Sequence, residues 1–373
     1  MRIIHVHHHY WPVVGGLENV VKALAEGMAK LGHEVHVITS TYGAQNRPKE
    51  EEINGVYVHR VKSIRLIYPD LTYPAGYPVD LLKTADVVHG HSQNSLFTVK
   101  MIERAKKLGA KTALHFMAID SMNDHPNPLI RLVGPYYAKR MLHKALKISD
   151  IKMVRAIRDG TIFKTKYGID TYFVPDGIDE EFIRTPNRAA IFLSRYQLHE
   201  PFVLFIGRLD KLKGIDTLIK AMSAVRREAP ELKAVITGPG DQIPYKTLAE
   251  KLGVKNRVIF TGLLLGEIKI GAIDASLTLT LPSLSETFPL VIMEAWARGK
   301  PVITTPVGDI PYRVKHGENG ILVPPRNPKA LRDAILLLFQ DENLRRKLGT
   351  SGKKQIYTWS EIVTKLTKIY RDN

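Results

Sequence analysis

The strongest constraint on the fold of this chain is an alternation of short strands and helices. Residues 2–8 have a strand pattern, residues 17–31 carry apolar side chains at helical spacing, and 34–40 has a second strand pattern. Strands that alternate with helices form parallel, doubly wound sheets. Further strands of the same half are predicted over 55–61, 85–90, 111–116 and 171–174.

The alternation begins again after residue 200. An apolar run over 202–207 predicts a buried strand, a helix follows over about 214–229, and the segment 174–195 between the halves is interpreted as a hinge. Later strands are predicted over 233–238, 257–261, 276–281, 301–304 and 320–323. The architecture predicted is α/β: two Rossmann-like domains with doubly wound parallel sheets, facing a cleft. The expected parts are a first domain over 1–175, a second over 176–357, and a final helix over 358–373 that packs back on the first domain.

Composition excludes several kinds of chemistry. The 373 residues suit two domains, and 54 Lys and Arg against 37 Asp and Glu give a net charge of +17, which favours an anionic partner. Because there is no Cys, disulfides, cysteine metal sites and thiol nucleophiles are excluded, as is typical of a reducing cytoplasm. No apolar run reaches 18 residues, and residues 1–4 lead directly into a strand without a signal-peptide pattern. A cytoplasmic protein is predicted.

The loops do not fit the common cofactor motifs. The first loop contains only Gly15 and Gly16 in place of G-x-G-x-x-G, and the second strand ends at Ser40 rather than at an acidic residue, which argues against NAD. A phosphate-binding P-loop and a D-x-D manganese motif are also missing. His5, His7 and His9 would share one face of a strand, which is compatible with metal ligation. The alternative is a buried strand with a polar end, and no metal is predicted.

The segment 283–301 is the richest in candidate functional residues. Pro289, preceded by Glu286 and Thr287, predicts the start of a helix whose free backbone N–H groups and dipole suit a phosphate. Glu294 lies two helical turns beyond Glu286, and a carboxylate can accept hydrogen bonds from two sugar hydroxyls. An acidic helix cap followed by a solvated glutamate is the alternative.

Two other loops follow predicted strands of the second half. Arg208, Lys211 and Lys213 come after the first strand, at the edge where open α/β sheets bind ligands, and arginine can bind a diphosphate through two hydrogen bonds. Gly238 and Gly240 follow the next strand, where small residues would let a base or a ribose approach the backbone. For the loop with Arg208, Lys211 and Lys213, the alternative is that its charge has no ligand and only reflects the overall basic composition of the protein.

Taken together, these segments resemble glycosyltransferase family 4, whose members are retaining, metal-independent transferases of GT-B fold. The resemblance covers essentially the whole chain. It is carried by Gly15-Gly16, by Gly207-Arg208 with Lys213-Gly214, by Gly238 and Gly240, by the E-x7-E pair Glu286 and Glu294, and by 307–311 and 317–323.

The resemblance implies a transferase that moves a hexose from a UDP- or GDP-sugar, with no further cofactor. Arg208 and Lys213 would bind the phosphates, and Glu294 would bind the ribose. The sugar and a phosphate would be held by Glu286 together with the backbone of Thr287, Phe288, Pro289 and Leu290. The loop with Gly15 and Gly16 would lie over the diphosphate, and the donor site would be lined by Gly238 and Gly240. His115 matches the position of an acceptor-side histidine of the family. The catalytic set implied is thus His115, Arg208, Lys213 and Glu286, although a lone histidine at such a position is otherwise structural.

The chain departs from the family pattern at two places. Asp176 stands where the family usually has asparagine, and Arg155-Ala156 stands where members often carry serine. Both departures leave the identity of the acceptor open.

Positive charge concentrates between residues 129 and 167, where ten cations are accompanied by only Asp150 and Asp159. If Pro135 begins a helix, one face is basic and the other apolar, which is typical of a helix that lies on anionic lipid. The basic face would contain Lys139, Arg140, His143, Lys144 and Lys147. Lipid-acceptor members of the family carry a membrane-binding helix in this region, so a lipid-linked acceptor at the inner membrane face is predicted. A packed helix with a solvated basic face is the alternative.

Two other functions compete with this assignment. A sugar-nucleotide 2-epimerase shares the GT-B architecture but needs no acceptor, so its product differs. A nucleic-acid partner is not predicted, because no nucleic-acid module and no basic stripe with interleaved aromatics occurs in the sequence.

Overall fold

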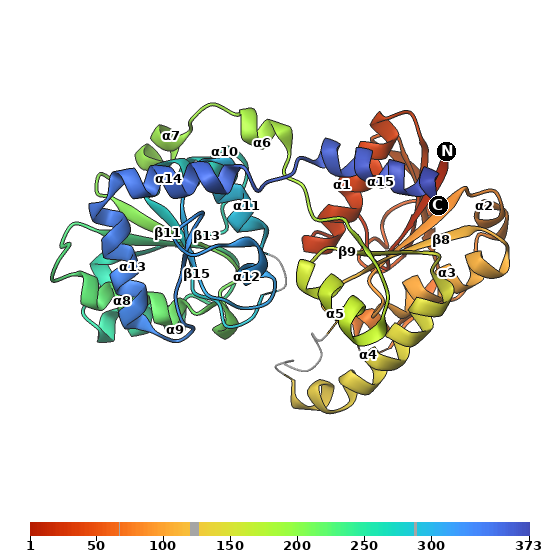
Figure 1. Ribbon diagram of the computed structural model, residues 1–373, viewed down its shortest axis with the longest axis horizontal. Coiled ribbons are helices and arrows are strands. Elements are labelled where there is room, and N and C mark those ends of the chain that lie inside the picture. The colour runs from red at the N-terminus through yellow and green to blue at the C-terminus, as the bar shows by residue number, and fades with distance from the viewer. Residues whose placement is uncertain (67, 120–126, 287–288) are drawn as a thin grey trace. The chain divides into compact units, whose positions relative to one another are not determined.

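The computed structural model describes residues 1–66, 68–119, 127–286 and 289–373, and the chain divides into two compact units (Figure 1). The first unit consists of Met1–Gly177 and Trp359–Asn373, and the second of Ile178–Thr358. The sequence analysis expected these divisions after residues 175 and 357. Both units are α/β with a predominantly parallel sheet, as predicted.

The first unit is built on an eight-stranded sheet of order β10-β9-β8-β7-β1-β2-β4-β3, in which only β3 runs antiparallel to its neighbour. Because β1 lies between β2 and β7, the strand order reverses direction between β1 and β7. The strands are β1 (Arg2–Val6), β2 (Glu34–Ser40), β3 (Glu50–Ile53), β4 (Val56–Val61), β7 (Val87–His91), β8 (Lys111–Phe116), β9 (Ile151–Val154) and β10 (Tyr172–Phe173), with a separate antiparallel pair β5 (Ser63–Arg65) and β6 (Thr72–Pro74).

Helices cover both faces of this sheet. The final helix α15 (Trp359–Asp372) packs beside α1 (Gly16–Lys30), and Ile362 and Leu366 share a core with Leu24 (Figure 1). The apolar side chains of α15 fall on one face at helical spacing, which explains why it docks on the sheet. The other elements are η1 (Pro69–Leu71), α2 (Val79–Lys83), α3 (Leu96–Lys107), α4 (Pro128–Ile148) and α5 (Ile157–Tyr167).

The second unit has a six-stranded, fully parallel sheet of order β13-β12-β11-β14-β15-β16. Its order reverses between β11 and β14. The strands are β11 (Phe202–Ile206), β12 (Lys233–Thr237), β13 (Val258–Gly262), β14 (Thr278–Leu281), β15 (Val302–Thr304) and β16 (Ile321–Leu322). The helices are α6 (Glu180–Arg184), α7 (Ala189–Tyr196), η2 (Lys211–Lys213), α8 (Ile215–Val225), α9 (Ile243–Lys251), η3 (Lys255–Arg257), α10 (Gly266–Ala275), α11 (Leu290–Ala297), α12 (Ile310–Arg313), α13 (Pro328–Gln340) and α14 (Glu342–Lys353).

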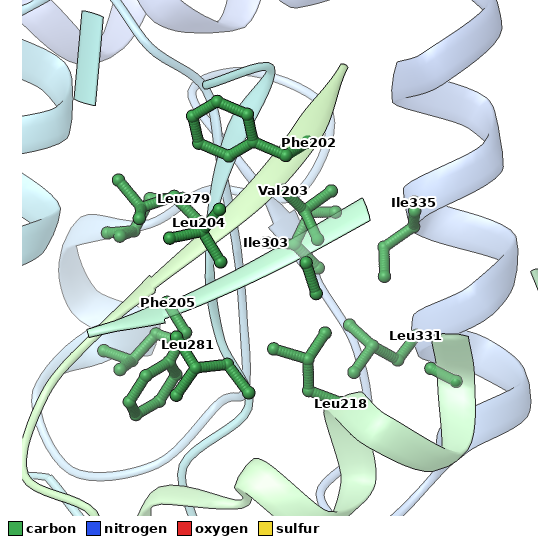
Figure 2. Close-up of a cluster of buried hydrophobic side chains, with 14 of the residues drawn as sticks. Phe202, Val203, Leu204, Phe205, Leu218, Leu279, Leu281, Ile303, Leu331 and Ile335 are labelled. Atoms are coloured by element: carbon green, nitrogen blue, oxygen red, sulfur yellow. The ribbon is translucent and has the colours of Figure 1, made fainter. Parts of the chain in front are cut away.

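The central strand β11 is apolar and buried at every position, as expected of a parallel strand covered on both faces. Figure 2 shows its side chains among residues of the neighbouring strands and of the helices α8 and α13. Leu218 of α8 and Leu331 of α13 close one side of this core (Figure 2). The loops that follow β11 and β14 therefore start from a rigid base.

Two sequence interpretations need correction. The segment 174–195 is not a hinge throughout, because α6 and α7 belong to the second unit, where Phe192 is fully buried. These helices have five and eight residues, too few for a clear periodicity. The basic helix α4 begins at Pro128, and Pro135 lies inside it, although its missing N–H costs one backbone hydrogen bond.

Among the residues that the structure describes, no helix is both long enough and apolar enough to cross a membrane.

The packing of α14 on α11 leads to a stability prediction. A Cβ on Gly352 would lie 2.1 Å from Cδ1 of the buried Trp296, which α11 carries. We expect Gly352→Ala to lower the free energy of unfolding by about 1–3 kcal/mol, because overpacking outweighs the better helix propensity of alanine. The control is Gly160→Ala in α5, where the nearest atoms lie 3.4 Å away. Equal or higher stability of the Gly352 variant in chemical denaturation would contradict this packing.

Candidate functional site

A cavity of about 360 Å³ lies in the second unit where the loops after β11 and β14 meet. This is the point at which the strand order reverses, and open α/β sheets bind ligands at such points. Both loops contribute to its walls, which include Gly207, Arg208, Lys213, Glu286, Pro289 and Leu290.

Close backbone approaches hold these loops together. Gly214 has a φ of +66°, and a Cβ there would lie 2.0 Å from the carbonyl oxygen of Pro282. Gly238 has a φ of +144°, and its Cβ would lie 1.8 Å from the carbonyl oxygen of Gly207. Gly238 and Gly240 are not among the residues that line the cavity. Their small size allows protein backbone to approach closely at both positions, and their contact with a base or a ribose stays a prediction.

An ion pair joins the two loops inside the cavity. Lys213 Nζ donates to Glu286 Oε1 at 2.7 Å, and the hydroxyl of Ser283 donates to the same oxygen at 2.7 Å. The Glu286 side chain is only 8% exposed, so losing Lys213 would leave a carboxylate buried without its cation. The structure thus brings together two residues that the sequence analysis assigned to phosphate and to sugar.

Arg208 lies beside this pair with its guanidinium exposed. Within the described ranges its side chain forms no hydrogen bond or ion pair. Its loop is nevertheless ordered, since the Asp210 carboxylate accepts a hydrogen bond from the backbone N–H of Leu212 at 2.8 Å and Leu209 N donates to Pro239 O at 2.8 Å. Arg208 is therefore an available cation on a fixed loop.

The helix α11 points its N-terminal end toward the cavity. It begins at Leu290, one residue after the predicted Pro289, and among the described residues no side chain caps its first turn. Its first backbone N–H groups can therefore donate to a ligand, and the helix dipole favours an anion there. Thr287 and Phe288, which were also predicted to bind the donor, lie outside the described residues.

Glu294 forms an ion pair that was not predicted from the sequence. Lys269 of α10 donates from Nζ to Glu294 Oε1 at 2.6 Å, and Glu294 does not line the cavity that contains Glu286. Its Oε2 atom is buried and has no partner among the described residues. Lys269 was missed because it lies in a short helix without a motif. The Glu294–Lys269 pair still offers an unpaired acceptor oxygen.

In the first unit, His115 lies near the end of β8 and is buried. Its Nε2 atom lies 3.1 Å from the carbonyl oxygen of Val174, which can only accept, so Nε2 carries the proton and Nδ1 has a lone pair. Burial, with a smaller effect of the Arg155 charge, lowers the pKa of His115 to about 3. His115 is therefore a neutral imidazole with an unpartnered Nδ1 among the described residues.

The two departures from the family pattern contact each other. Arg155 forms an ion pair with Asp176 through Nη2 and Oδ2, and Asp176 is almost fully buried. A buried carboxylate requires a cation, and Arg155 supplies it. The aspartate that replaces the usual asparagine and the arginine near the usual serine are thus one paired feature.

The first loop of this unit is acidic as well as glycine-rich. Gly15 precedes α1, and a Cβ there would lie 2.2 Å from Glu18 Oε2. Burial acts to raise the pKa of Glu18, but its interactions with His7 and His9 outweigh this and hold the pKa well below its usual value. The strand β1 ends at Val6, so the prediction that His5, His7 and His9 share a strand face is wrong.

Asp70 is a site candidate that sequence reasoning missed. It lies in η1, its Oδ1 is 3.9 Å from His8 Nε2, and burial raises its pKa. The segment before it has no periodicity or motif that could have indicated it. Together with His8 and Glu18, Asp70 forms a polar cluster at the carboxyl ends of β1 and β7.

Only some of the side chains predicted to form the basic face of α4 are exposed. Lys139, Arg140 and Lys147 are exposed, whereas Lys144 donates to Glu103 at 2.6 Å and is half-buried. The first half of the helix exposes large apolar side chains next to these cations, namely Leu132 (78%), Val133 (55%) and Tyr136 (74%). Among the described residues, α4 therefore presents a surface that is both apolar and basic.

Comparisons with known proteins fit this architecture. Anabaena HepE, solved in complex with UDP, superposes with a TM-score of 0.79 at 19% identity and complete coverage of both chains. The fold is that of the GT-B glycosyltransferases.

The family models match both halves of the chain. The model described as Glycosyltransferase Family 4 matches residues 14–182, and the one described as Glycosyl transferases group 1 matches 192–355. An uncharacterized glycosyltransferase of Methanocaldococcus jannaschii is 30% identical, with 100% of this chain and 98% of the relative covered. D-inositol 3-phosphate glycosyltransferase of Corynebacterium aurimucosum is 27% identical over 100% of this chain and 96% of its own. The chain belongs to glycosyltransferase family 4.

The buried histidines lead to a pH prediction. Burial lowers the pKa of His5 and His115 to about 3, so the unfolded chain binds more protons than the native protein between pH 6.5 and 3. The free energy of unfolding should therefore fall as the pH is lowered through this range, by up to about 1.4 kcal/mol per pH unit for each such histidine.

Two variants test whether His115 contributes to this pH dependence of the free energy of unfolding. His115→Gln keeps a donor for Val174 and should flatten the pH dependence in denaturant titrations at pH 7, 6 and 5. His199→Gln, at an exposed position, should leave the dependence unchanged. An identical pH dependence of wild type and His115→Gln would contradict the assignment.

Proposed function

We propose that this protein is a retaining glycosyltransferase that moves a hexose from a UDP- or GDP-sugar to a lipid-linked acceptor, without a metal ion at the donor site. The observation that carries this proposal is the cavity at the strand-order reversal of the second unit. There an exposed arginine, a lysine paired with Glu286 and the N-terminal end of α11 converge.

The donor diphosphate is the group that these features suit. Arg208 and Lys213 carry positive charge, and the first backbone N–H groups of α11, which begins at Leu290, can donate to an anion. Such donors stabilise the charge that develops on a departing diphosphate, a role that a divalent cation has in other transferases. Lys213 would then be shared between Glu286 and a phosphate oxygen.

The sugar and the ribose would be held by the two carboxylates. Glu286 has one oxygen, Oε1, fixed by Lys213 and Ser283, which sets the orientation of the whole group. Glu294 has an unpaired buried oxygen, Oε2, that can accept a hydroxyl hydrogen bond. Transfer with retention would proceed on the front face of the sugar, with the diphosphate helping to deprotonate the acceptor.

Two features of the first unit support the acceptor part of the proposal. The polar cluster of His8, Glu18 and Asp70 can exchange hydrogen bonds with several hydroxyl groups. The exposed apolar and basic side chains of α4 suit an anionic membrane surface, where a lipid-linked acceptor would lie. The compound in the name of a relative, inositol 3-phosphate, is a cyclic polyol and so belongs to the same hydroxyl-rich class.

A sugar-nucleotide 2-epimerase remains the second candidate from the same architecture. It would return an isomerised sugar still attached to its nucleotide, whereas a transferase releases the free nucleoside diphosphate. The relatives reported above are named as glycosyltransferases, which favours transfer.

The donor site is tested by calorimetric titration with UDP, GDP and ADP in the presence of EDTA. We expect one of the first two to bind, and Arg208→Ala to weaken that binding roughly 10- to 100-fold, since a hydrogen bond to a charged group contributes about 1.5–3 kcal/mol. Lys211→Ala is the matched control, because Lys211 is an exposed cation of the same loop that does not line the cavity. Binding of none of the nucleotides, or equal effects of both variants, would contradict the site.

The membrane interaction is tested by sedimentation with vesicles. We expect binding to vesicles that contain anionic lipid, and a loss of about tenfold or more in Lys139→Gln/Arg140→Gln, since each cation near such a surface contributes about 1 kcal/mol. The control Lys353→Gln/Lys354→Gln removes the same charge from exposed positions at the end of α14. Equal sedimentation with anionic and neutral vesicles would overturn this part of the proposal.

A further inference from the structure

Four histidines meet on one face of the first unit's sheet. His5 of β1 is the register partner of His89 in β7, and His91 of β7 is the register partner of His115 in β8. Because side chains alternate along a strand, His89 and His91 point to the same face. All four side chains are buried, with exposures of 0–1%. Polar groups at the centre of a sheet core are costly, so this cluster requires an explanation.

Three of these imidazoles have the spacing of a metal site. His5, His89 and His91 can each offer one ring nitrogen such that all three nitrogens lie within 4.8 Å of one another. Their ring centroids are 5.2, 5.3 and 4.2 Å apart. Three imidazoles bound to one zinc ion at a Zn–N distance of about 2.0–2.1 Å would have centroids roughly 5 Å apart.

The hydrogen bonds of the cluster leave it incompletely satisfied. His5 Nδ1 and His91 Nε2 face each other at 3.0 Å, and His89 Nδ1 lies 2.6 Å from the hydroxyl of Tyr370. The second nitrogen of each ring is buried and has no partner among the described residues. These three atoms are His5 Nε2, His89 Nε2 and His91 Nδ1. Buried polar atoms are normally paired, and of these three nitrogens His89 Nε2 is the one that an ion bound between His5 Nδ1 and His91 Nε2 would satisfy.

We propose that His5, His89 and His91 form a binding site for a divalent transition-metal ion of the class that imidazole prefers, with Zn²⁺ and Co²⁺ as representatives. The ion replaces the proton shared by His5 Nδ1 and His91 Nε2, which are already about as close as two ligands of one metal. His89 binds through Nε2, the nitrogen that Tyr370 leaves free.

Tyr370 gives this site an outer shell. When His89 Nδ1 donates its hydrogen to the Tyr370 oxygen, Nε2 carries the lone pair that can bind a metal. Metal-bound histidines are commonly oriented in this way, by a hydrogen bond that the second ring nitrogen donates to a neighbouring group. Tyr370 belongs to α15, so the ion would link the last helix of the chain to β1 and β7. The role is structural, independent of the proposed transferase function, and separate from the donor cavity in the second unit.

The site is tested on the untagged full-length protein, refolded with Co²⁺ or Zn²⁺ and freed of excess metal by gel filtration. Because the ligands are buried, the ion has to enter during folding. We expect about one ion per chain by elemental analysis, an increase in thermal stability that prolonged chelation reverses, and visible absorption of Co²⁺ with low coordination number. The protein has no Cys, so thiolate binding cannot produce this signal.

Variants distinguish this site from a surface alternative. His36 Nδ1 and His59 Nε2 also lie 3.0 Å apart, with Glu34 and Glu50 beside them, so His59→Asn is the matched control. We expect His91→Gln to lose the ion and His59→Asn to keep it. The reverse result, or less than about 0.1 ion per chain in the wild type, would overturn the proposal.

One measurement does not depend on a variant that folds. X-ray absorption of the wild-type cobalt or zinc protein reports how many imidazoles bind the metal. Three imidazoles support the buried site. Two or fewer, with carboxylate oxygen in the remaining positions, would indicate an adventitious ion on the surface and would contradict the buried site.

Discussion

The arrangement of the second unit depends on how closely the loops after β11 and β14 approach each other. Gly214 allows its backbone to pass the carbonyl of Pro282, and Leu284 N donates to Leu212 O at 2.7 Å. The Lys213–Glu286 pair then closes across the gap at 2.7 Å. Because both strands are buried on both faces, these loops cannot shift without disturbing the core. A cation, a carboxylate and a helix end thereby converge at one point.

The two units use the same topological position for different chemistry. In each, polar groups gather at the carboxyl ends of the strands between which the order reverses. The second unit presents cations and backbone N–H groups there, which suit an anion. The first unit presents imidazoles and the carboxylates of Glu18 and Asp70, which suit hydroxyl groups. This division of charge is consistent with a donor that carries a diphosphate and an acceptor that carries hydroxyls.

Periodicity and loop motifs indicated the elements and the donor-side residues, because those signals are local in sequence. The strands β2 and β8 have the predicted bounds, and Arg208, Lys213 and Glu286 line one cavity. The contacts Lys269–Glu294 and Arg155–Asp176 join residues 25 and 21 positions apart, so spacing along the chain could not indicate them. The start of α4 was misplaced for a different reason: proline also occurs inside a long helix when tertiary packing offsets the lost hydrogen bond.

The proposed donor site requires the second-unit cavity to bind a nucleoside diphosphate through the protein's own cations and amides. A crystal structure of the protein grown with UDP and EDTA would show whether it does. We expect diphosphate oxygens within hydrogen-bond distance of Lys213 Nζ, of the Arg208 guanidinium and of the first backbone N–H groups of α11. A nucleotide bound elsewhere, with Lys213 still paired only to Glu286, would contradict it.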